Sequence, residues 1–252
     1  MNEKVTLSAR DISAGYGSKI VLSDINFDLV EGQIISLIGP NGSGKSTLLK
    51  TLMGALPPLK GNVLLNGRDL GTMPGSEIAK VMAVMMTGNI RPEWMTCREM
   101  AASGRYPYTG LLGKLGKKDS EAVDEAMELT GTSDLASLYI TEISDGQRQR
   151  VLLAKAICQE PDILILDEPT TFLDIRYKLE FLNLLRILAE KRHVTILMSL
   201  HELELVRLVS DRVICLKDRH MDADGGKEVL DDEYLRNLYN IGENEFPEYR
   251  II

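Results

Sequence analysis

Cysteine is scarce in this sequence of 252 residues, which has three, Cys97, Cys158 and Cys215, and no Cys-x-x-Cys pair. Such wide spacing excludes a disulfide framework and a clustered zinc site, and it fits a reducing compartment. Positive charge is also in deficit, since 29 Lys and Arg residues stand against 37 Asp and Glu residues. Proteins that bind nucleic acid by neutralising its phosphates normally show the opposite balance, so we expect no nucleic-acid partner.

Long apolar runs are missing as well. No segment of the sequence approaches the roughly 18–20 apolar residues that span a bilayer. Residues 1–11 lack the apolar stretch of a signal peptide, so we expect a cytosolic chain. What remains is an ordinary globular composition, 44% hydrophobic and 26% charged, and the length allows one large domain or two small ones.

Two kinds of strand are predicted. Residues 5–9 and 25–29 alternate apolar and polar side chains, as half-exposed antiparallel strands do. Mostly apolar runs predict buried strands instead, and these lie at residues 34–38, 163–166, 194–198 and 213–216. Helical patterns such as residues 179–191 separate them. Buried strands that alternate with helices predict a parallel sheet covered on both faces.

The middle of the chain, residues 88–159, differs because it has no long β-branched run. It contains helical stretches at residues 121–129 and 147–159. A loop between helices is indicated by glycine and proline residues, namely Gly104, Pro107, Gly110, Gly113 and Gly116. We interpret this region as a helical subdomain inserted into an α/β core.

The most specific motif is a glycine-rich loop of the pattern Gly-x-x-x-x-Gly-Lys-Ser/Thr. It reads Gly39-Pro40-Asn41-Gly42-Ser43-Gly44-Lys45-Ser46-Thr47. A predicted strand precedes it and a helical segment follows, which disfavours a chance glycine-rich turn. Glycines let backbone N–H groups converge on phosphate oxygens, and the helix N-terminus adds its dipole. We expect Lys45 to place its charge on the β- and γ-phosphates and Ser46 to hold Mg²⁺.

Two adjacent carboxylates, Asp167 and Glu168, follow the apolar run at residues 163–166. This position places them at the carboxyl edge of the sheet, where such folds bind ligands. Alone the pattern is weak evidence, but downstream of a phosphate-binding loop it becomes strong. We expect Asp167 to join the Mg²⁺ shell and Glu168 to polarise the attacking water.

A third segment, Ile143-Ser144-Asp145-Gly146-Gln147, resembles the Leu-Ser-Gly-Gly-Gln signature of the ATP-binding cassette (ABC) ATPases. In that family the signature binds the γ-phosphate of ATP held by the opposite subunit, and the resemblance assigns this role to Ser144, Gly146 and Gln147. Asp145 departs from the consensus. Its carboxylate is favourable for the helix dipole but repels phosphate unless it points away. The alternative is a simple Ser-capped surface helix.

The resemblance covers essentially the whole chain and implies further site residues. Tyr16 matches the aromatic residue that stacks on adenine, and Asp174 matches the loop that crosses the dimer interface. His201 matches a histidine that senses the γ-phosphate, so Glu168 and His201 are the implied catalytic residues. An isolated Tyr-Gly is more often only a turn, and a lone histidine beside a strand is usually structural. The implied cofactors are ATP and Mg²⁺.

The family fold is α/β, a P-loop NTPase (RecA-like) core with an antiparallel β subdomain and an inserted helical subdomain. We therefore expect a single ABC ATPase domain over residues 1–252. In this prediction residues 1–87 and 160–252 form the core, and residues 88–159 form the helical subdomain with the signature.

One element of the family is missing from its place. The family has a glutamine that contacts Mg²⁺ and the nucleophilic water where the core meets the helical subdomain, and residues 85–89 contain none. Thr87 gives the best alignment. Its hydroxyl could contact Mg²⁺ or water, with a shorter reach than an amide. If the alignment slips, Asn89 is the next residue to consider.

Residues 96–100 and 104–108 resemble segments of the ATPases of iron-chelate (siderophore), haem and cobalamin importers. The resemblance implies a homodimer that forms on ATP binding, cytoplasmic and peripheral on the inner face of the cell membrane. Integral membrane permease subunits are expected to contact residues 88–115. An extracytoplasmic binding protein would be involved only indirectly.

Two other functions compete with this one. A non-transport ABC protein of nucleic-acid repair or translation usually carries coiled-coil insertions or tandem cassettes, and this chain has one cassette and no heptad run. A regulatory ATP-binding module with weak hydrolysis is suggested by the missing glutamine and by Asp145. The presence of Glu168 and His201 argues against it.

Overall fold

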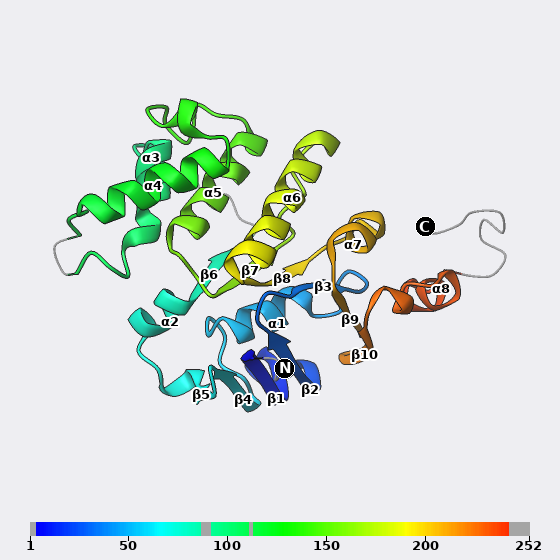
Figure 1. Cartoon of the computed structure of the whole chain (residues 1–252). Helices are drawn as coiled ribbons and strands as arrows, with labels where there is room; N and C mark the ends of the chain where they lie inside the picture. The colour runs from blue at the N-terminus through cyan, green and yellow to red at the C-terminus, as the bar shows by residue number, and fades with distance from the viewer. Residues whose placement is uncertain (1–3, 87–91, 111–112, 242–252) are drawn as a thin grey trace. The chain divides into compact units, whose positions relative to one another are not determined.

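The computed structural model describes residues 4–86, 92–110 and 113–241 (Figure 1). The chain forms two compact units, of which unit 1 comprises residues 1–72 and 195–252 and unit 2 comprises residues 73–194. Both units combine helices with β-strands, so the predicted α/β class is confirmed. The predicted boundaries between core and helical subdomain lie between residues 87 and 88 and between residues 159 and 160. A division into compact units does not test them, so they stay a prediction.

Unit 1 contains an antiparallel sheet in the order β2-β1-β4-β5 (Figure 1). Its strands are β1 (Val5–Tyr16), β2 (Lys19–Val30), β4 (Lys60–Leu65) and β5 (Arg68–Asp69). The antiparallel pairing predicted for residues 5–9 and 25–29 is confirmed, with Leu7 opposite Leu29 and Ala9 opposite Phe27. This sheet is the predicted antiparallel β region.

The half-exposed character predicted for the start of β1 is wrong, because Thr6 and Ser8 are buried. Their hydroxyl groups have acceptors. Thr6 Oγ1 donates to the Leu29 carbonyl at 3.2 Å, and Ser8 Oγ donates to the Asp28 carboxylate. A hydroxyl that keeps a hydrogen bond can be buried at low cost, so the polar residues of this segment do not mark a solvent face.

A second sheet of unit 1 places β3 (Ile34–Ile38) between β8 (Thr195–Ser199) and β9 (Arg212–Lys217), parallel to both. Strand β10 (His220–Gly225) pairs with β9 in antiparallel orientation. Every residue of β3 and β8 is buried, as their apolar runs predict. Because β3 and β8 run parallel, the segments that follow them leave the sheet at the same edge.

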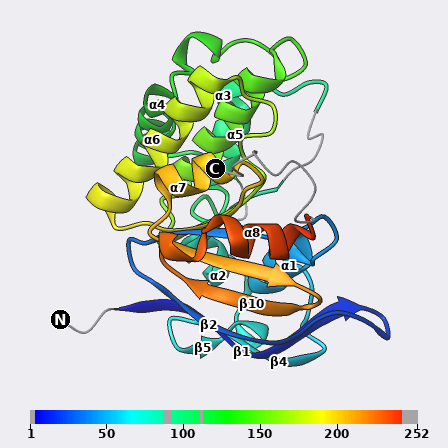
Figure 2. The ribbon, with the colours of Figure 1, turned by 90° about the vertical axis from the view of Figure 1, so that its right-hand side faces the viewer.

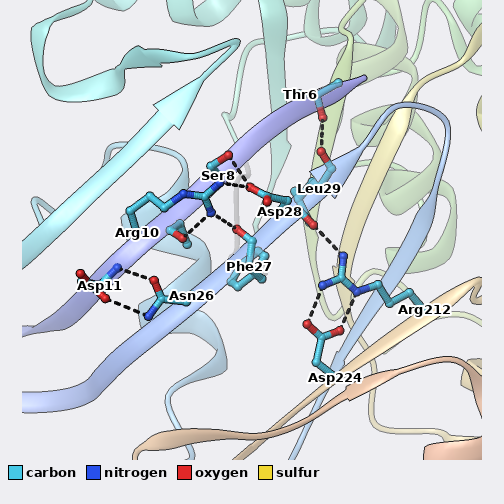
Figure 3. A network of polar contacts seen from close by, with 11 residues as sticks. Thr6, Ser8, Arg10, Asp11, Asn26, Phe27, Asp28, Leu29, Arg212 and Asp224 are labelled. Carbon is cyan, nitrogen blue, oxygen red and sulfur yellow. Dashed lines mark hydrogen bonds and ion pairs between the residues drawn. The ribbon is translucent and has the colours of Figure 1, made fainter. Parts of the chain in front are cut away.

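Arg212 ties the two sheets of unit 1 together (Figure 3). It donates to the Asp28 carbonyl of β2 at 2.6 Å and makes two hydrogen bonds, of 2.6 and 2.5 Å, to the Asp224 carboxylate of β10. The hydrogen bond to Asp224 raises the pKa of Arg212. These hydrogen bonds join strand β9, which flanks β3, to β2 and to β10.

Unit 1 is completed by α1 (Lys45–Leu52), α7 (Leu203–Val209) and α8 (Asp232–Tyr239). Short 3-10 helices lie at Leu70–Thr72 and Lys227–Val229. Helix α8 runs beside the β9–β10 hairpin (Figure 2).

Unit 2 is mainly helical, and in its described residues the strands β6 (Met82–Met85) and β7 (Ile163–Asp167) form a parallel pair. Its helices are α2 (Gly75–Val81), α3 (Cys97–Ala102), α4 (Lys117–Leu129), α5 (Asp145–Cys158) and α6 (Ile175–Arg192), with 3-10 turns at Ser103–Arg105 and Ser133–Leu135. The helices predicted at residues 121–129 and 179–191 are confirmed as parts of α4 and α6. The helix predicted at residues 147–159 is confirmed up to Cys158, where α5 ends. Gly104, expected in a loop, lies in a 3-10 turn, where a Cβ would come within 2.1 Å of the Lys155 carbonyl oxygen.

Arg105 fixes the segment that leads from this turn to α4. The side chain is buried and donates to the Cys158 carbonyl at 2.8 Å, to Glu160 at 2.6 Å and to Asp119 at 2.9 Å. The Tyr108 ring stacks on its guanidinium at 4.1 Å. Burial of an arginine is favourable only when its N–H groups are paired, and this pairing holds residues 105–108 against the end of α5.

The three cysteines are buried free thiols. Burial raises the pKa of Cys158 and of Cys215 to about 11, so both stay protonated near neutral pH. None of the helices within residues 4–86, 92–110 and 113–241 combines the length and apolar character needed to cross a membrane.

Candidate nucleotide-binding and hydrolysis site

The glycine-rich loop lies where the sequence predicts it, between the end of β3 and the start of α1. Gly39 and Gly44 have φ angles of +145° and +102°, which residues with a side chain rarely adopt. A Cβ on Gly39 would lie 2.2 Å from the Leu216 carbonyl oxygen, and one on Gly44 would lie 2.7 Å from the Leu22 side chain. Both positions therefore require glycine.

Helix α1 begins without a side-chain cap. Gly44 is its N-cap residue, no side chain accepts a hydrogen bond there, and the first turn of α1 has no acidic residue. The N-terminal N–H groups and the positive end of the helix dipole are thus directed at whatever binds in the loop. Such a terminus is suited to an anion, and above all to phosphate.

Two buried polar side chains of the loop support this assignment. Lys45 is 6% exposed, and its Nζ donates to the carbonyls of Gly39 at 2.7 Å and Pro40 at 3.1 Å. Ser43 Oγ is buried and, within the described part of the chain, has no hydrogen-bond partner. A buried hydroxyl without a partner is costly, so Ser43 fits a loop that binds the oxygen atoms of a ligand.

His201 is brought to the same sheet edge as this loop. Leu37 pairs with Ser199 at the end of β8, and the Leu200 N–H donates to the Leu37 carbonyl at 3.3 Å. His201 follows directly and is exposed. Tyr16 ends β1, in the antiparallel sheet of the same unit, and is 50% exposed, which leaves ring surface for stacking.

Asp167 is the last residue of strand β7 in unit 2, and Glu168 follows it directly. Asp167 is 4% exposed, whereas Glu168 is partly exposed and has a φ of 47°. This left-handed conformation is strained for a residue with a side chain, and such strain occurs often at functional sites. Thr171 Oγ1 donates to the Glu168 carbonyl at 3.1 Å and lies 3.5 Å from its carboxylate.

Helix α5 begins in the signature segment, and its first turn is closed by its own side chains. Ser144 Oγ accepts a hydrogen bond from the Gln147 N–H at 3.2 Å, and Gln147 Oε1 accepts one from the Ser144 N–H at 2.9 Å. This reciprocal capping box satisfies two N–H groups at the helix terminus. Each of these two signature side chains therefore binds the backbone N–H of the other residue.

Asp145, the departure from the family consensus, forms an ion pair with Arg148. Arg148 is buried and also donates to the Ile143 carbonyl at 3.3 Å. The carboxylate at the helix start is thereby paired within its own helix. Sequence reasoning does not single out Arg148, although a spacing of three residues between opposite charges on a helix is a signal for such a pair.

The signature helix packs against the loop that follows β7. Gln149 Nε2 donates at 2.8 Å to the carbonyl of Pro169, the residue after Glu168. A Cβ on Gly146 would lie 3.5 Å from the Phe172 carbonyl oxygen. Gln149 is thus a second residue that sequence reasoning misses, since only the folded chain shows its acceptor.

Asp174 belongs to the same loop and caps α6 by accepting a hydrogen bond from the Tyr177 N–H at 3.1 Å. Unit 2 therefore brings together three predicted elements: Glu168, the signature and the loop of Asp174. Thr87 and Asn89 lie outside the described residues.

An exposed groove of about 300 Å³ lies on unit 2, within the region predicted to contact a permease. It is lined by Trp94, Met95, Glu99, Ala102, Ser103, Tyr106, Gly113 and Leu115. Trp94 is 82% exposed and Tyr106 is 65% exposed. Large aromatic side chains at such exposure are typical of protein-binding surfaces.

Sequence comparison agrees with this geometry. Residues 22–171 match the ABC transporter family. The chain is 37% identical over 237 residues to the iron(3+)-hydroxamate import ATP-binding protein FhuC of Bacillus subtilis. This alignment covers 94% of this chain and 88% of that protein. It is 35% identical over 243 residues to the ferric enterobactin transport ATP-binding protein FepC of Escherichia coli, covering 96% and 90%.

Structural comparison agrees as well. A protein assigned to the metal-chelate type of ABC transporter, solved in an inward-facing conformation, aligns with a TM-score of 0.81 and 26% identity over 93% of this chain and 88% of that one. The cbiO1 protein of Clostridium perfringens, part of the transporter complex cbiONQ, aligns with a TM-score of 0.80 and 25% identity over 98% and 97%. The predicted fold is confirmed, and the chain belongs to the ABC transporter family as an ATP-hydrolysing cassette.

Proposed function

We propose that the chain powers the import of an iron–siderophore complex, or of a related metal chelate such as haem or cobalamin, through a separate membrane permease. The uncapped terminus of α1 behind the glycine-rich loop is the observation that carries the ATP-binding part. The cargo is supported by the relatives, whose names specify iron(3+)-hydroxamate and ferric enterobactin.

The loop holds ATP by its phosphates. Backbone N–H groups of the loop bind phosphate oxygens, Ser43 Oγ gains an acceptor, and Lys45 places its ammonium on the terminal phosphates. The exposed ring of Tyr16 stacks on adenine. These contacts position the nucleotide and screen its charge.

Ser46 and Asp167 are the side chains that would hold Mg²⁺, with Thr87 as a further proposed ligand. A hydroxyl and a carboxylate fit this cation, which prefers hard oxygen ligands. When bound, Mg²⁺ neutralises phosphate charge and orients the transferred group.

Glu168 acts on the attacking water, and His201 contacts the γ-phosphate. The strained backbone at Glu168 and the hydrogen bond from Thr171 to its carbonyl fix where its carboxylate points. A carboxylate held in this way accepts a hydrogen bond from water and makes its oxygen more nucleophilic.

The signature acts on a second copy of the chain. Ser144, Gly146 and Gln147 contact the γ-phosphate held by the partner, and Asp174 lies in the loop that crosses the interface. Ser144 Oγ accepts the Gln147 N–H, so its hydroxyl hydrogen can still be donated to phosphate, whereas the Gln147 N–H has to leave Ser144 Oγ before it can donate to phosphate itself. ATP would then close a homodimer, and hydrolysis would reopen it.

The permease docks on the groove of Trp94 and Tyr106, so the subunit works peripherally on the cytoplasmic face of the membrane. Trp94 and Tyr106 of the groove are exposed in the single chain, and Arg105 holds the neighbouring segment against the end of α5. An extracytoplasmic binding protein delivers the cargo without touching this chain.

Replacement of Glu168 by glutamine tests the proposal in the assembled transporter. We expect Glu168→Gln to lower ATP hydrolysis by about 10²–10⁴-fold while ATP binding and complex assembly persist. Glu180→Gln, an exposed carboxylate on α6 that pairs with Arg176, is the control and should hydrolyse ATP normally. Near-normal hydrolysis by Glu168→Gln would reject its role.

The cargo is tested by uptake into cells that carry the wild-type transporter. We expect accumulation of radioactive iron from a ferric siderophore, lost with Glu168→Gln. Transport of haem or cobalamin but not of ferric siderophore would show that one of these related chelates is the cargo. Hydrolysis without transport of any chelate would favour the regulatory alternative.

A further inference from the structure

One face of the signature helix α5 borders the segment that follows Glu168. Gly146 and Gln149 stand three residues apart on α5, so they lie on the same face of the helix. A Cβ on Gly146 would meet the Phe172 carbonyl oxygen at 3.5 Å. Gln149 Nε2 donates to the Pro169 carbonyl at 2.8 Å. The helix therefore contacts this segment at two points.

The hydrogen bond from Gln149 is a buried one. Gln149 is 8% exposed, and Pro169 is buried as well. A buried N–H that loses its acceptor is costly, so the Pro169 carbonyl is held where Gln149 Nε2 reaches it. The proline ring also fixes its own φ angle, which leaves this residue little freedom to move. Gln149 thus anchors the residue that is bonded directly to Glu168.

The backbone of Glu168 needs such an anchor. A residue before proline favours extended backbone, yet Glu168 has a φ of 47°. A strained conformation persists only where the surrounding structure imposes it. The Glu168 carbonyl accepts hydrogen bonds from the N–H and Oγ1 of Thr171, at 3.4 and 3.1 Å, and the next carbonyl, that of Pro169, accepts one from Gln149. Two successive carbonyl groups are therefore fixed, and with them the direction in which the Glu168 side chain leaves the backbone.

We propose that Gln149 is a positioning residue for Glu168, and that it links the signature helix to the carboxylate that acts on the attacking water. The proposal rests on the proposed role of Glu168 in hydrolysis. Gln149 acts through the Pro169 carbonyl rather than on the nucleotide. The helix whose first turn serves the ATP of a second copy thereby also sets the carboxylate that serves the ATP of its own subunit.

The test compares two amide deletions on the same helix. Gln149→Met keeps the length of the side chain and removes the N–H donor. Gln159→Met is the matched control, because this amide, at the other end of α5, donates to the Ala79 and Met82 carbonyls at 2.5 and 2.7 Å. Each change is made in the wild-type chain and in Glu168→Gln. The full-length chain is measured for melting temperature and ATP affinity, and the assembled transporter for kcat and KM, with single-turnover hydrolysis of radioactive ATP for the slow variants.

We expect Gln149→Met to lower kcat about tenfold, because a small displacement of a catalytic group slows the reaction steeply. KM and ATP affinity should change less than about twofold, since binding of the ground state is untouched. In the Glu168→Gln background the same change should alter the residual rate less than about twofold, because the group that Gln149 positions is already gone. Gln159→Met should lower the melting temperature and leave kcat within about twofold of wild type.

A normal kcat in Gln149→Met would overturn the proposal. So would equal fractional losses of kcat in the wild-type and Glu168→Gln backgrounds, or an equal loss in Gln159→Met. If Gln149→Met does not fold, Gln149→Asn takes its place, because it keeps an amide on a shorter side chain, and the same outcomes decide. Glu168→Gln alone tests the proposed function separately: near-normal hydrolysis by that variant would reject catalysis by Glu168, whatever Gln149→Met does.

Discussion

The N-termini of α1 and α5 are two helix ends assigned to the same ligand, and they are built in opposite ways. Helix α1 starts at a glycine with no side-chain cap and no acid in its first turn. Helix α5 starts at Ser144, which shares a capping box with Gln147, and has Asp145 in its first turn. An open terminus binds an anion without rearrangement, whereas a capped terminus has to exchange its own hydrogen bonds for those of the ligand.

This difference matches the proposed roles. The loop before α1 binds ATP within its own subunit, so a helix terminus without a side-chain cap lets phosphate bind there directly. The terminus of α5 meets phosphate only when a second copy arrives, so in the single chain its N–H groups need another acceptor. The capping box supplies that acceptor and stabilises the helix until the dimer forms.

The largest expected effect comes from Lys45, at the open terminus. Lys45→Ala removes a buried ammonium from the loop, and because hydrogen bonds to charged groups are strong we expect ATP affinity to fall at least about tenfold. Calorimetry measures it. Lys50→Ala, in the last turn of α1, is the matched control and should bind ATP as the wild type does. Unchanged affinity in Lys45→Ala would contradict the account of the loop.

A smaller effect is expected from Ser144, at the capped terminus. Ser144→Ala should cost about 1 kcal/mol of stability through the lost cap, leave ATP affinity of the single subunit unchanged and weaken ATP-dependent dimerisation. Thr96→Ala breaks the corresponding capping box of α3 and serves as the control. It should lose similar stability and keep dimerisation. If the two variants dimerise equally well, Ser144 is only a helix cap.

The smallest effect is expected from Asp145. Its carboxylate pairs with Arg148, and the Asp145 side chain is 48% exposed, so Asp145→Asn should change stability by less than about 1 kcal/mol. Hydrolysis by the assembled transporter should change less than about twofold, because the charge is already paired. A tenfold or greater rise in hydrolysis would show instead that the carboxylate repels phosphate.

The sequence is most informative where structure depends on neighbouring residues. The glycine-rich loop and the strands at residues 34–38 and 163–166 are predictable because consecutive residues determine the turn conformation and the burial. The capping box of Ser144 follows from the same local logic.

Contacts between distant residues are not predictable in this way. Thr6 and Ser8 are buried because Leu29 and Asp28 accept their hydrogen bonds, which alternation alone cannot reveal. Gln149 donates its hydrogen bond to the Pro169 carbonyl, which lies 20 residues further along the chain. Asp145 lies between these cases, since its partner is one helical turn away.

Sedimentation of Glu168→Gln, with and without ATP and Mg²⁺, tests the central claim most directly. The account predicts a monomer without nucleotide and a dimer with it, because hydrolysis no longer reopens the complex. It also predicts that the double variant Glu168→Gln/Ser144→Ala binds ATP with unchanged affinity but forms much less dimer. A mass that does not change with ATP, or a double variant that dimerises as well as Glu168→Gln, would contradict the separate roles assigned to the N-termini of α1 and α5.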